Sequence, residues 1–281
     1  MNRKLKEVII GRPGVDGKVS LVHVLSRRNL KDADPLLLMD AFKSDDPGEY
    51  SAGFPMHPHR GIETISYVYS GSMVHKDSLG NEDAVSDGGV QWMTAGSGIF
   101  HEEMIPAVPH LLGVQIWLNL ASKDKMAQPS YHNISDIREI PFDGGFVRLL
   151  AGQYENSKGF QSKYQAVTYL DVHIYPGSKF EMDLEEDRTL MLFALIGEAY
   201  VEDQLIPNFS AGLGEDKGDK VVIENRSDQE VSILLFTSKK IQEPVAWPTG
   251  PIVMNTQEEI DLAYQEIEDG TFLKDHIDMN A

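Results

Sequence analysis

The feature that most constrains the fold is a series of short, strand-like runs that recurs along almost the whole chain. They are rich in β-branched and aromatic residues, and clusters of Gly, Pro, Asn and Asp separate them at short intervals. Such runs are typical of an all-β sandwich or barrel. The clearest are VSLVHVL (19–25), ETISYVYSG (63–71), GVQIWLNL (113–120), GFVRLLAG (145–152), AVTYLDVHIY (166–175), TLMLFALIGEAYV (189–201), DKVVIEN (219–225) and EVSILLFTS (230–238).

One helix is expected near the end of the chain, over about residues 256–269. Asn255 or Thr256 can cap its first turn, where acidic residues suit the positive end of the helix dipole. Gly270 follows the last periodic position and favours termination there. A second, short helix is predicted over residues 135–138.

A degenerate internal repeat divides the chain into two halves. TISYVYSGSM (64–73) aligns with LMLFALIGEA (190–199), each being an apolar strand that ends in a glycine turn. The repeat predicts two β-barrels of the same design. We therefore expect domains at 1–135 and 136–281, with the terminal helix in the second.

Composition narrows the chemistry. The chain has no cysteine, which excludes disulfides, thiolate zinc sites, iron–sulfur clusters and cysteine nucleophiles, so histidines and carboxylates must carry any metal or acid–base chemistry. Its net charge of −19 disfavours nucleic-acid and anionic-membrane partners; the acidity serves solubility or docking of a basic protein. With no secretory leader and no apolar run near ~18 residues, a cytoplasmic location is expected, or a nuclear one in a eukaryote.

Two pairs of side chains have metal-ligand character. His57 and His59 flank Pro58 at i and i+2, a spacing that directs both side chains to one face of an extended segment. His101 and Glu103 repeat that spacing farther along the chain. A chain with nine histidines contains a His-x-His pair by chance roughly 0.3 times. Spacing alone therefore leaves open a metal site or histidines that hydrogen-bond within a β-protein.

The ligand types point to a class of ion. Three neutral imidazoles and one carboxylate suit Fe(II), Mn(II), Ni(II) or Cu(II), whereas Ca²⁺ and Mg²⁺ prefer oxygen ligands. Four protein ligands on an octahedral ion leave two positions open, which an oxygenase needs for O2 and substrate. A closed zinc site is the structural alternative.

Several other side chains can be interpreted as either functional or structural. His75 is either a structural or pocket-lining residue or a proton shuttle. Arg60 and Glu63 form either a pair that orients a ligand imidazole or an ordinary buried ion pair. Four apolar side chains either wall a pocket for a flat substrate or belong to the core: Trp92, Met93, Phe100 and Trp117.

Several longer blocks resemble the signature of the pirin family: FPMHPHRGIETISY, GSMVHKDSLG and VQWMTAGSGIFHEEM, with LKDADPLLLMDAF (30–42) near the start and PIVMNTQEEI near the end. The resemblance extends from about residue 8 to about residue 273. The chain departs from the family at one position. Before the Gln-Trp-Met block the family usually has Gly-Asp-Val, whereas this chain has Gly88, Gly89 and Val90. This change puts the local turn in doubt, but it affects no ligand.

The resemblance implies a bicupin, that is, two double-stranded β-helix (jelly-roll) barrels with a C-terminal helix. The first barrel would bind iron through His57, His59, His101 and Glu103. The second would bind no metal, because the repeat places residues without imidazoles at the corresponding positions: Asp183, Glu185, Ser232 and Leu234.

The resemblance also implies an activity, that of a quercetin 2,3-dioxygenase-type oxidoreductase. Such an enzyme opens a flavonol ring with O2 and releases carbon monoxide; Glu103 would be catalytic by accepting the 3-hydroxyl proton. The cofactor would be one divalent transition metal, Fe(II) first, with Mn, Ni, Cu or Zn as alternatives. The alternative function is a redox-sensitive iron protein that modulates transcription factors or metabolic enzymes through protein contacts. A monomer is expected.

Overall fold

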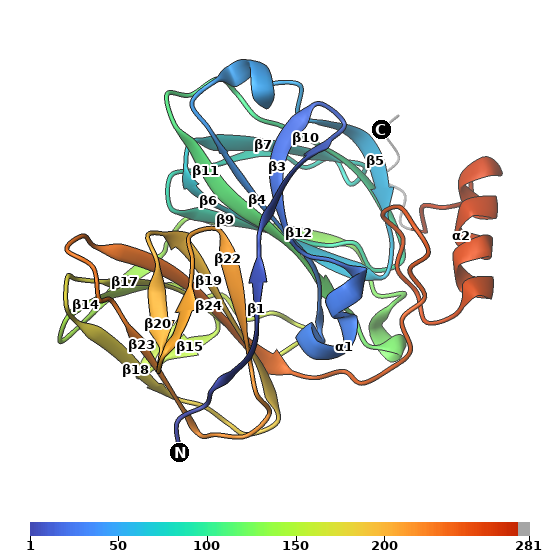
Figure 1. The fold of residues 1–281 in the computed structure, drawn as a ribbon. Helices are drawn as coiled ribbons and strands as arrows, with labels where there is room; N and C mark the ends of the chain where they lie inside the picture. The colour runs from blue at the N-terminus through green and yellow to red at the C-terminus, as the bar shows by residue number, and fades with distance from the viewer. Residues whose placement is uncertain (275–281) are drawn as a thin grey trace. The chain divides into compact units, whose positions relative to one another are not determined.

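The computed structural model describes residues 1–274, and its regular structure consists mostly of strands, which confirms the all-β prediction (Figure 1). The chain forms two compact units. Unit 1 comprises Met1–Arg12, Val22–Pro35 and Asp136–Lys240, and unit 2 comprises Pro13–Leu21, Leu36–Ser135 and the segment that begins at Ile241. Residues 275–281 of the predicted second domain lie outside the described part of the chain.

Unit 2 is built on a four-stranded antiparallel sheet, ordered β5-β10-β7-β8, and a seven-stranded sheet, ordered β12-β9-β6-β11-β4-β3-β2. Their strands are β2 (Arg12–Asp16), β3 (Val19–Leu25), β4 (Leu36–Ser44), β5 (Phe54–His59), β6 (Ile62–Ser70), β7 (Ser72–Asp77), β8 (Glu82–Ser86), β9 (Gly89–Thr94), β10 (Ile99–Met104), β11 (Leu111–Asn119) and β12 (Ser130–Ile134).

Unit 1 repeats this plan with a seven-stranded sheet, ordered β1-β22-β19-β24-β17-β14-β13, and a four-stranded sheet, ordered β18-β23-β20-β21; β15 and β16 form a hairpin. The strands are β1 (Leu5–Ile10), β13 (Arg138–Phe142), β14 (Gly145–Ala151), β15 (Gln153–Tyr154), β16 (Ser157–Lys158), β17 (Val167–Ile174), β18 (Lys179–Asp183), β19 (Arg188–Ile196), β20 (Ala199–Val201), β21 (Gln204–Ile206), β22 (Ser210–Gly214), β23 (Lys220–Glu224) and β24 (Val231–Lys239). The bicupin prediction is thereby confirmed.

The helices are few and short. The terminal helix α2 (Gln257–Glu268) is confirmed; Thr256 is its cap, and Glu259 completes a capping box. The chain also contains α1 (Leu30–Ala33) and three 3-10 turns, at Arg27–Asn29, Pro47–Glu49 and Ser122–Asp124. No helix among residues 1–274 is long and apolar enough to cross a membrane.

One sequence prediction needs correction. The short helix predicted over 135–138 is wrong, because Arg138 begins β13 and pairs with Leu149 of β14. The division into domains at residue 135 stays a prediction. β1 pairs with β22 of unit 1, whereas α2 belongs to unit 2, where Ile260 packs with Phe272 in an apolar cluster.

Both units combine an apolar core with buried polar side chains. In unit 1, alternate residues of β14, β17, β19 and β24 form one continuous apolar core, including Val172, Leu192 and Ile233. Burying each such side chain contributes roughly 1.5–3 kcal/mol. Beside its own apolar residues, unit 2 buries a set of polar side chains that includes three histidines: His59, His75, Gln91, His101 and Glu103. Buried polar groups are costly unless they are partnered, so their concentration here marks a candidate site.

Candidate metal centre

Three adjacent strands build the site, and each supplies residues at i and i+2. His101 on β10 pairs with His57 on β5 and with Asp77 on β7. Because side chains alternate along a strand, His57 and His59 share one face of β5. β5 is the edge strand of its sheet, so Pro58, which lacks an N–H, leaves no interior ladder bond unmade.

The three predicted histidines converge on one point. The Nε2 atom of His57 lies 3.0 Å from Nε2 of His59 and 3.0 Å from Nε2 of His101. The rings approach edge to face or at a tilt, with centroids 4.4–5.0 Å apart. Among residues 1–274 these three histidines form the group of potential ligands with metal-site spacing.

The outer ring nitrogens decide which atoms face inward. Nδ1 of His57 lies 2.8 Å from the Pro55 carbonyl oxygen, and Nδ1 of His59 lies 3.0 Å from that of Pro251. A carbonyl only accepts, so each Nδ1 carries the hydrogen and donates it. In the neutral rings, both inward-facing Nε2 atoms therefore present lone pairs.

Burial keeps the rings neutral. Desolvation, followed by the nearby His57, lowers the pKa of His59 to about 3. Desolvation and the neighbouring imidazoles also hold the pKa of His101 well below its ordinary value. Lone pairs brought within 3.0 Å of one another repel unless a cation lies between them. The donor set thus fits a divalent transition metal.

Glu103 lies two residues beyond His101, on the same strand and almost fully buried. Its Oε1 accepts hydrogen bonds from Gln91 Nε2 (2.6 Å), Gln115 Nε2 (3.1 Å) and Ser66 Oγ (3.4 Å), and its Oε2 accepts one from Gln115 Nε2 (2.9 Å). A register shift in the β5–β10 pairing falls between His101 and Glu103. The role of Glu103 as the fourth ligand stays a prediction.

The segment after β24 supports the site from behind. Arg60 is buried and forms an ion pair with Glu266 (2.7 Å), and its guanidinium donates to the carbonyl oxygens of Ser97 (2.7 Å) and Phe272 (2.8 Å). The backbone of Arg60 also bridges to Ile252, next to the carbonyl that holds His59. Glu63, the other residue of the predicted pair, accepts a hydrogen bond from Thr94.

Of the four apolar side chains proposed to line a substrate pocket, Trp117 contacts a histidine of the site. The Trp117 ring is half-buried and stands edge-on to His59, with centroids 5.0 Å apart. Trp247 lies 5.7 Å from Trp117. Phe100 packs instead on Phe272. Trp92 and Met93 are buried, and Trp92 points to the face of β9 opposite Gln91, so these two are core residues.

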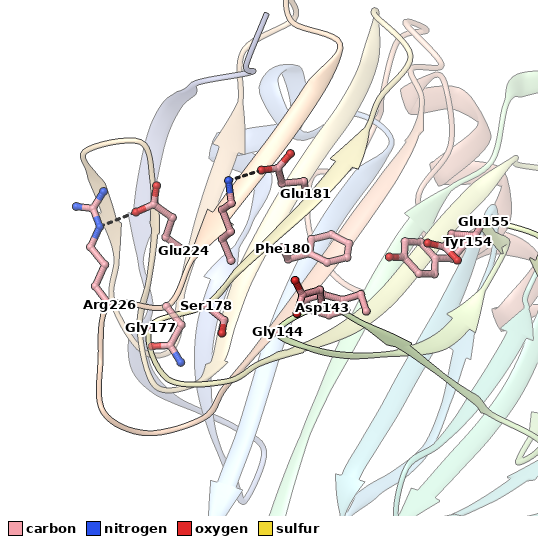
Figure 2. Close-up of a pocket in the computed structure, with 13 residues that line it drawn as sticks. Asp143, Gly144, Tyr154, Glu155, Gly177, Ser178, Phe180, Glu181, Glu224 and Arg226 are labelled. Atoms are coloured by element: carbon pink, nitrogen blue, oxygen red, sulfur yellow. Dashed lines mark hydrogen bonds and ion pairs between the residues drawn. The ribbon is translucent and has the colours of Figure 1, made fainter.

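A hollow of about 680 Å³ lies within unit 1, and Figure 2 shows the residues that line it. Two ion pairs lie on its lining, Lys179 with Glu181 and Arg226 with Glu224. None of its lining residues is a histidine, and none belongs to the predicted site. Its chemistry gives no reason to place the metal there.

Sequence reasoning missed several residues of the site. Gln91 and Gln115 orient Glu103, and Pro251 orients His59, but none of them carries a local motif. Asp77 was missed as well, although with His75, which the sequence analysis did single out, it repeats the i, i+2 spacing of the ligand pairs and shares a hydrogen bond of 2.8 Å. That spacing could have revealed Asp77.

Comparison with known proteins identifies the family. Residues 18–118 match the sequence model described as Pirin, and residues 169–273 match the Pirin C-terminal cupin domain. The human protein named Pirin is 38% identical over 251 residues, which cover 85% of this chain and 83% of the human protein.

Solved structures agree. A quercetin 2,3-dioxygenase from Acinetobacter baumannii superposes with a TM-score of 0.89 at 29% identity, covering 97% of this chain and 99% of that one. A bacterial pirin from Escherichia coli in complex with nickel(II) shares the fold, with a TM-score of 0.65 at 20% identity over 83% of this chain and 98% of that one. From these matches it follows that the chain belongs to the pirin family.

Proposed function

We propose that this protein is a metal-dependent dioxygenase that opens the ring of flavonols such as quercetin with O2 and releases carbon monoxide. The observation that carries the proposal is the convergence of three Nε2 lone pairs beside a buried carboxylate. His57 is only half-buried, which leaves the group accessible from one side. The structural likeness to a protein called quercetin 2,3-dioxygenase supports this choice of substrate class.

His57, His59, His101 and Glu103 would hold the metal, with Fe(II) as the proposed ion and Mn, Ni, Cu or Zn as competitors. The nickel(II) complex of the E. coli pirin supports a divalent ion in this fold. When bound, the metal supplies a Lewis-acidic charge and, as iron, the capacity for one-electron transfer to O2. The protein contributes preorganisation, since the outer nitrogens of the ligands are already held.

Glu103 is the proposed acceptor of the flavonol 3-hydroxyl proton. Its Oε1 already accepts three hydrogen bonds, whereas Oε2 accepts one from Gln115, counting the described residues. Oε2 therefore keeps one lone pair, which could bind the metal or the incoming proton but not both at once, so Glu103 would act as ligand and as base in turn. The amides of Gln91 and Gln115 hold the carboxylate plane while it works, as a general base requires.

Trp117 and Trp247 are the proposed contact surface for the flat rings of the substrate. Both are half-buried, and Trp117 stands directly against His59. Aromatic faces at the rim of a metal site favour stacking of an aromatic ligand. The donor Nε1 of Trp247 is held by the Gly250 carbonyl at 2.8 Å, which fixes that ring.

The test is turnover. Protein loaded anaerobically with Fe(II) and then exposed to O2 and quercetin should lose the flavonol absorbance and release carbon monoxide in equal amounts. His57→Ala should lower the rate by more than about 100-fold, since a ligand is removed. The matched control is His110→Ala, because His110 is an exposed histidine of the same unit, and its ring contacts the exposed side chain of Asp45.

An absence of carbon monoxide, or turnover that survives His57→Ala, would contradict the enzymatic proposal. Metal binding without turnover would instead favour the redox-sensitive regulator. Capture of protein partners by the ferrous and ferric forms would then test that alternative. The cytoplasmic location stays a prediction.

A further inference from the structure

A second histidine stands behind His101, where the other ligands have a carbonyl oxygen. Nδ1 of His101 lies 3.4 Å from Nδ1 of His75, and Nε2 of His75 lies 2.8 Å from Oδ2 of Asp77. All three side chains are buried. The result is a continuous chain from a carboxylate, through one imidazole, to the ring of a predicted metal ligand.

The direction of the hydrogen bonds follows from the end of this chain. Burial alone would raise the pKa of Asp77, but hydrogen bonds from His75 and Asn81 lower it, so the carboxylate is ionised and only accepts. In its neutral form, His75 carries its hydrogen on Nε2, which leaves Nδ1 as an acceptor. His101 must donate from Nδ1, which leaves its Nε2 lone pair pointing at the other two Nε2 atoms.

The carboxylate that sets this direction is itself held rigidly. Oδ1 of Asp77 accepts from the backbone N–H groups of Leu79 (2.9 Å) and Asn81 (3.1 Å), and the Asn81 side-chain amide donates to both carboxylate oxygens, Oδ1 (3.2 Å) and Oδ2 (2.9 Å). The His75 ring is stacked on Tyr131, with centroids 4.1 Å apart and planes 10° apart. Neither Asp77 nor His75 can rotate its side chain without breaking buried contacts.

We propose that Asp77 and His75 are positioning residues that fix the tautomer of His101, so that its Nε2 is free to bind the metal. The proposal rests on the metal site of the proposed function, and it is independent of the substrate. Hydrogen-bond partners behind metal-binding histidines commonly control affinity by fixing the ring and its tautomer.

Asp77→Asn should reverse the relay. Two backbone N–H groups, those of Leu79 and Asn81, favour an oxygen at the Oδ1 position, so the new amide NH2 takes the Oδ2 position and donates to Nε2 of His75. The Asn81 side-chain amide, which donates to Oδ2 at 2.9 Å, then turns its oxygen toward the new NH2. The His75 hydrogen then moves to Nδ1, and that of His101 moves to Nε2, the metal-facing atom. We expect the dissociation constant for Ni²⁺ to rise at least ~10-fold.

A double-mutant cycle isolates this route. His75→Phe should also weaken Ni²⁺ binding, because Nδ1 of His101 loses its acceptor, and adding Asp77→Asn to it should have no further effect. Asp45→Asn is the matched control, because Asp45 forms an exposed pair with His110 at 2.8 Å; it should leave affinity unchanged. Nitrogen-15 NMR of the metal-free protein should place the ring hydrogens on Nδ1 of His101 and Nε2 of His75. In Asp77→Asn they should instead be found on Nε2 of His101 and Nδ1 of His75.

The outcomes separate the two proposals. Failure of the unaltered protein to bind Ni²⁺ would refute the metal site, whatever the tautomers. Binding that is equal in the unaltered protein and Asp77→Asn would refute the relay alone. The relay would also be overturned by a doubly protonated His75, by an Nε2-protonated His101, or by an Asp77→Asn effect of the same size in the His75→Phe background.

Discussion

Replacing Arg60 with methionine tests how far the terminal segment stabilises unit 2. Arg60 is 2% exposed, and its guanidinium lies 4.2 Å above the centre of the Phe272 ring. Methionine keeps much of the apolar stem but removes both hydrogen bonds to carbonyl oxygens and the ion pair with Glu266. The side chain therefore changes its polar contacts far more than its packing.

The magnitude follows from the groups left behind. Hydrogen bonds to a charged donor contribute about 1.5–3 kcal/mol each, and Ser97 and Phe272 would each lose one. Glu266 keeps a second partner, Lys274, at 2.8 Å, so its carboxylate is not left as an unpaired charge. We expect the free energy of unfolding to fall by about 3 kcal/mol, at the lower end of the range for a broken buried pair.

Tryptophan fluorescence is the appropriate assay. All three tryptophans of the chain, Trp92, Trp117 and Trp247, lie in unit 2, so urea unfolding followed by their emission reports on that unit. Lys123→Met is the control, because the Lys123 side chain is 81% exposed. Removing an exposed cation should change the free energy by less than about 0.5 kcal/mol.

The reasoning would be refuted by a loss below about 1 kcal/mol in Arg60→Met. It would equally be refuted if Arg60→Met and Lys123→Met destabilised unit 2 by the same amount. Either result would mean that water replaces the guanidinium without cost.

Three further changes have defined outcomes. Glu103→Gln sets an amide against the donors that bind the carboxylate and should weaken Ni²⁺ binding by at least ~10-fold, measured by competition with a chelator. Burial alone would lower the pKa of His173, but Asp171 raises it above 6.5, so its protonated form stabilises the fold below that pH, and this contribution disappears as pH rises through the raised value. His173→Gln should therefore destabilise the protein more at about pH 6 than at about pH 9, as thermal unfolding followed by circular dichroism would show; a pH-independent loss would contradict this. Gly61→Ala places a Cβ 2.1 Å from the Val253 carbonyl oxygen at a φ of +77°, and should destabilise unit 2 by at least about 3 kcal/mol in the fluorescence assay; a neutral effect would rule out this close approach.

The strands and the terminal helix were predictable because their signals are local. β-branched runs between turn residues mark the strands, and Thr256 with Glu259 marks the start of α2. The helix predicted over 135–138 failed because cross-strand pairing with β14 outweighs local propensity. The pairing of β1 with β22 joins segments too far apart in sequence for any local pattern to reveal.

The residues of the candidate site likewise fall into those that the sequence predicts and those that it does not. His57, His59 and His101 were predictable from their spacing together with the family blocks, and the structure brings them together. Gln91 and Gln115 were not, because a glutamine on a strand is an ordinary residue until the carboxylate it binds is known. The contacts of the terminal segment were equally hidden, since a backbone carbonyl can be supplied by any residue type.

The carbonyl of Pro251 that holds His59 has a consequence for biosynthesis. A ribosome makes the predicted ligands early, but it makes their support near the end of the chain. A nascent polypeptide that has passed Glu103 thus carries every proposed ligand while His59 still lacks its acceptor. We expect the metal to be held firmly only after residue 251 has been made, and a premature stop before that residue to give a chain that has its proposed ligands but holds metal poorly.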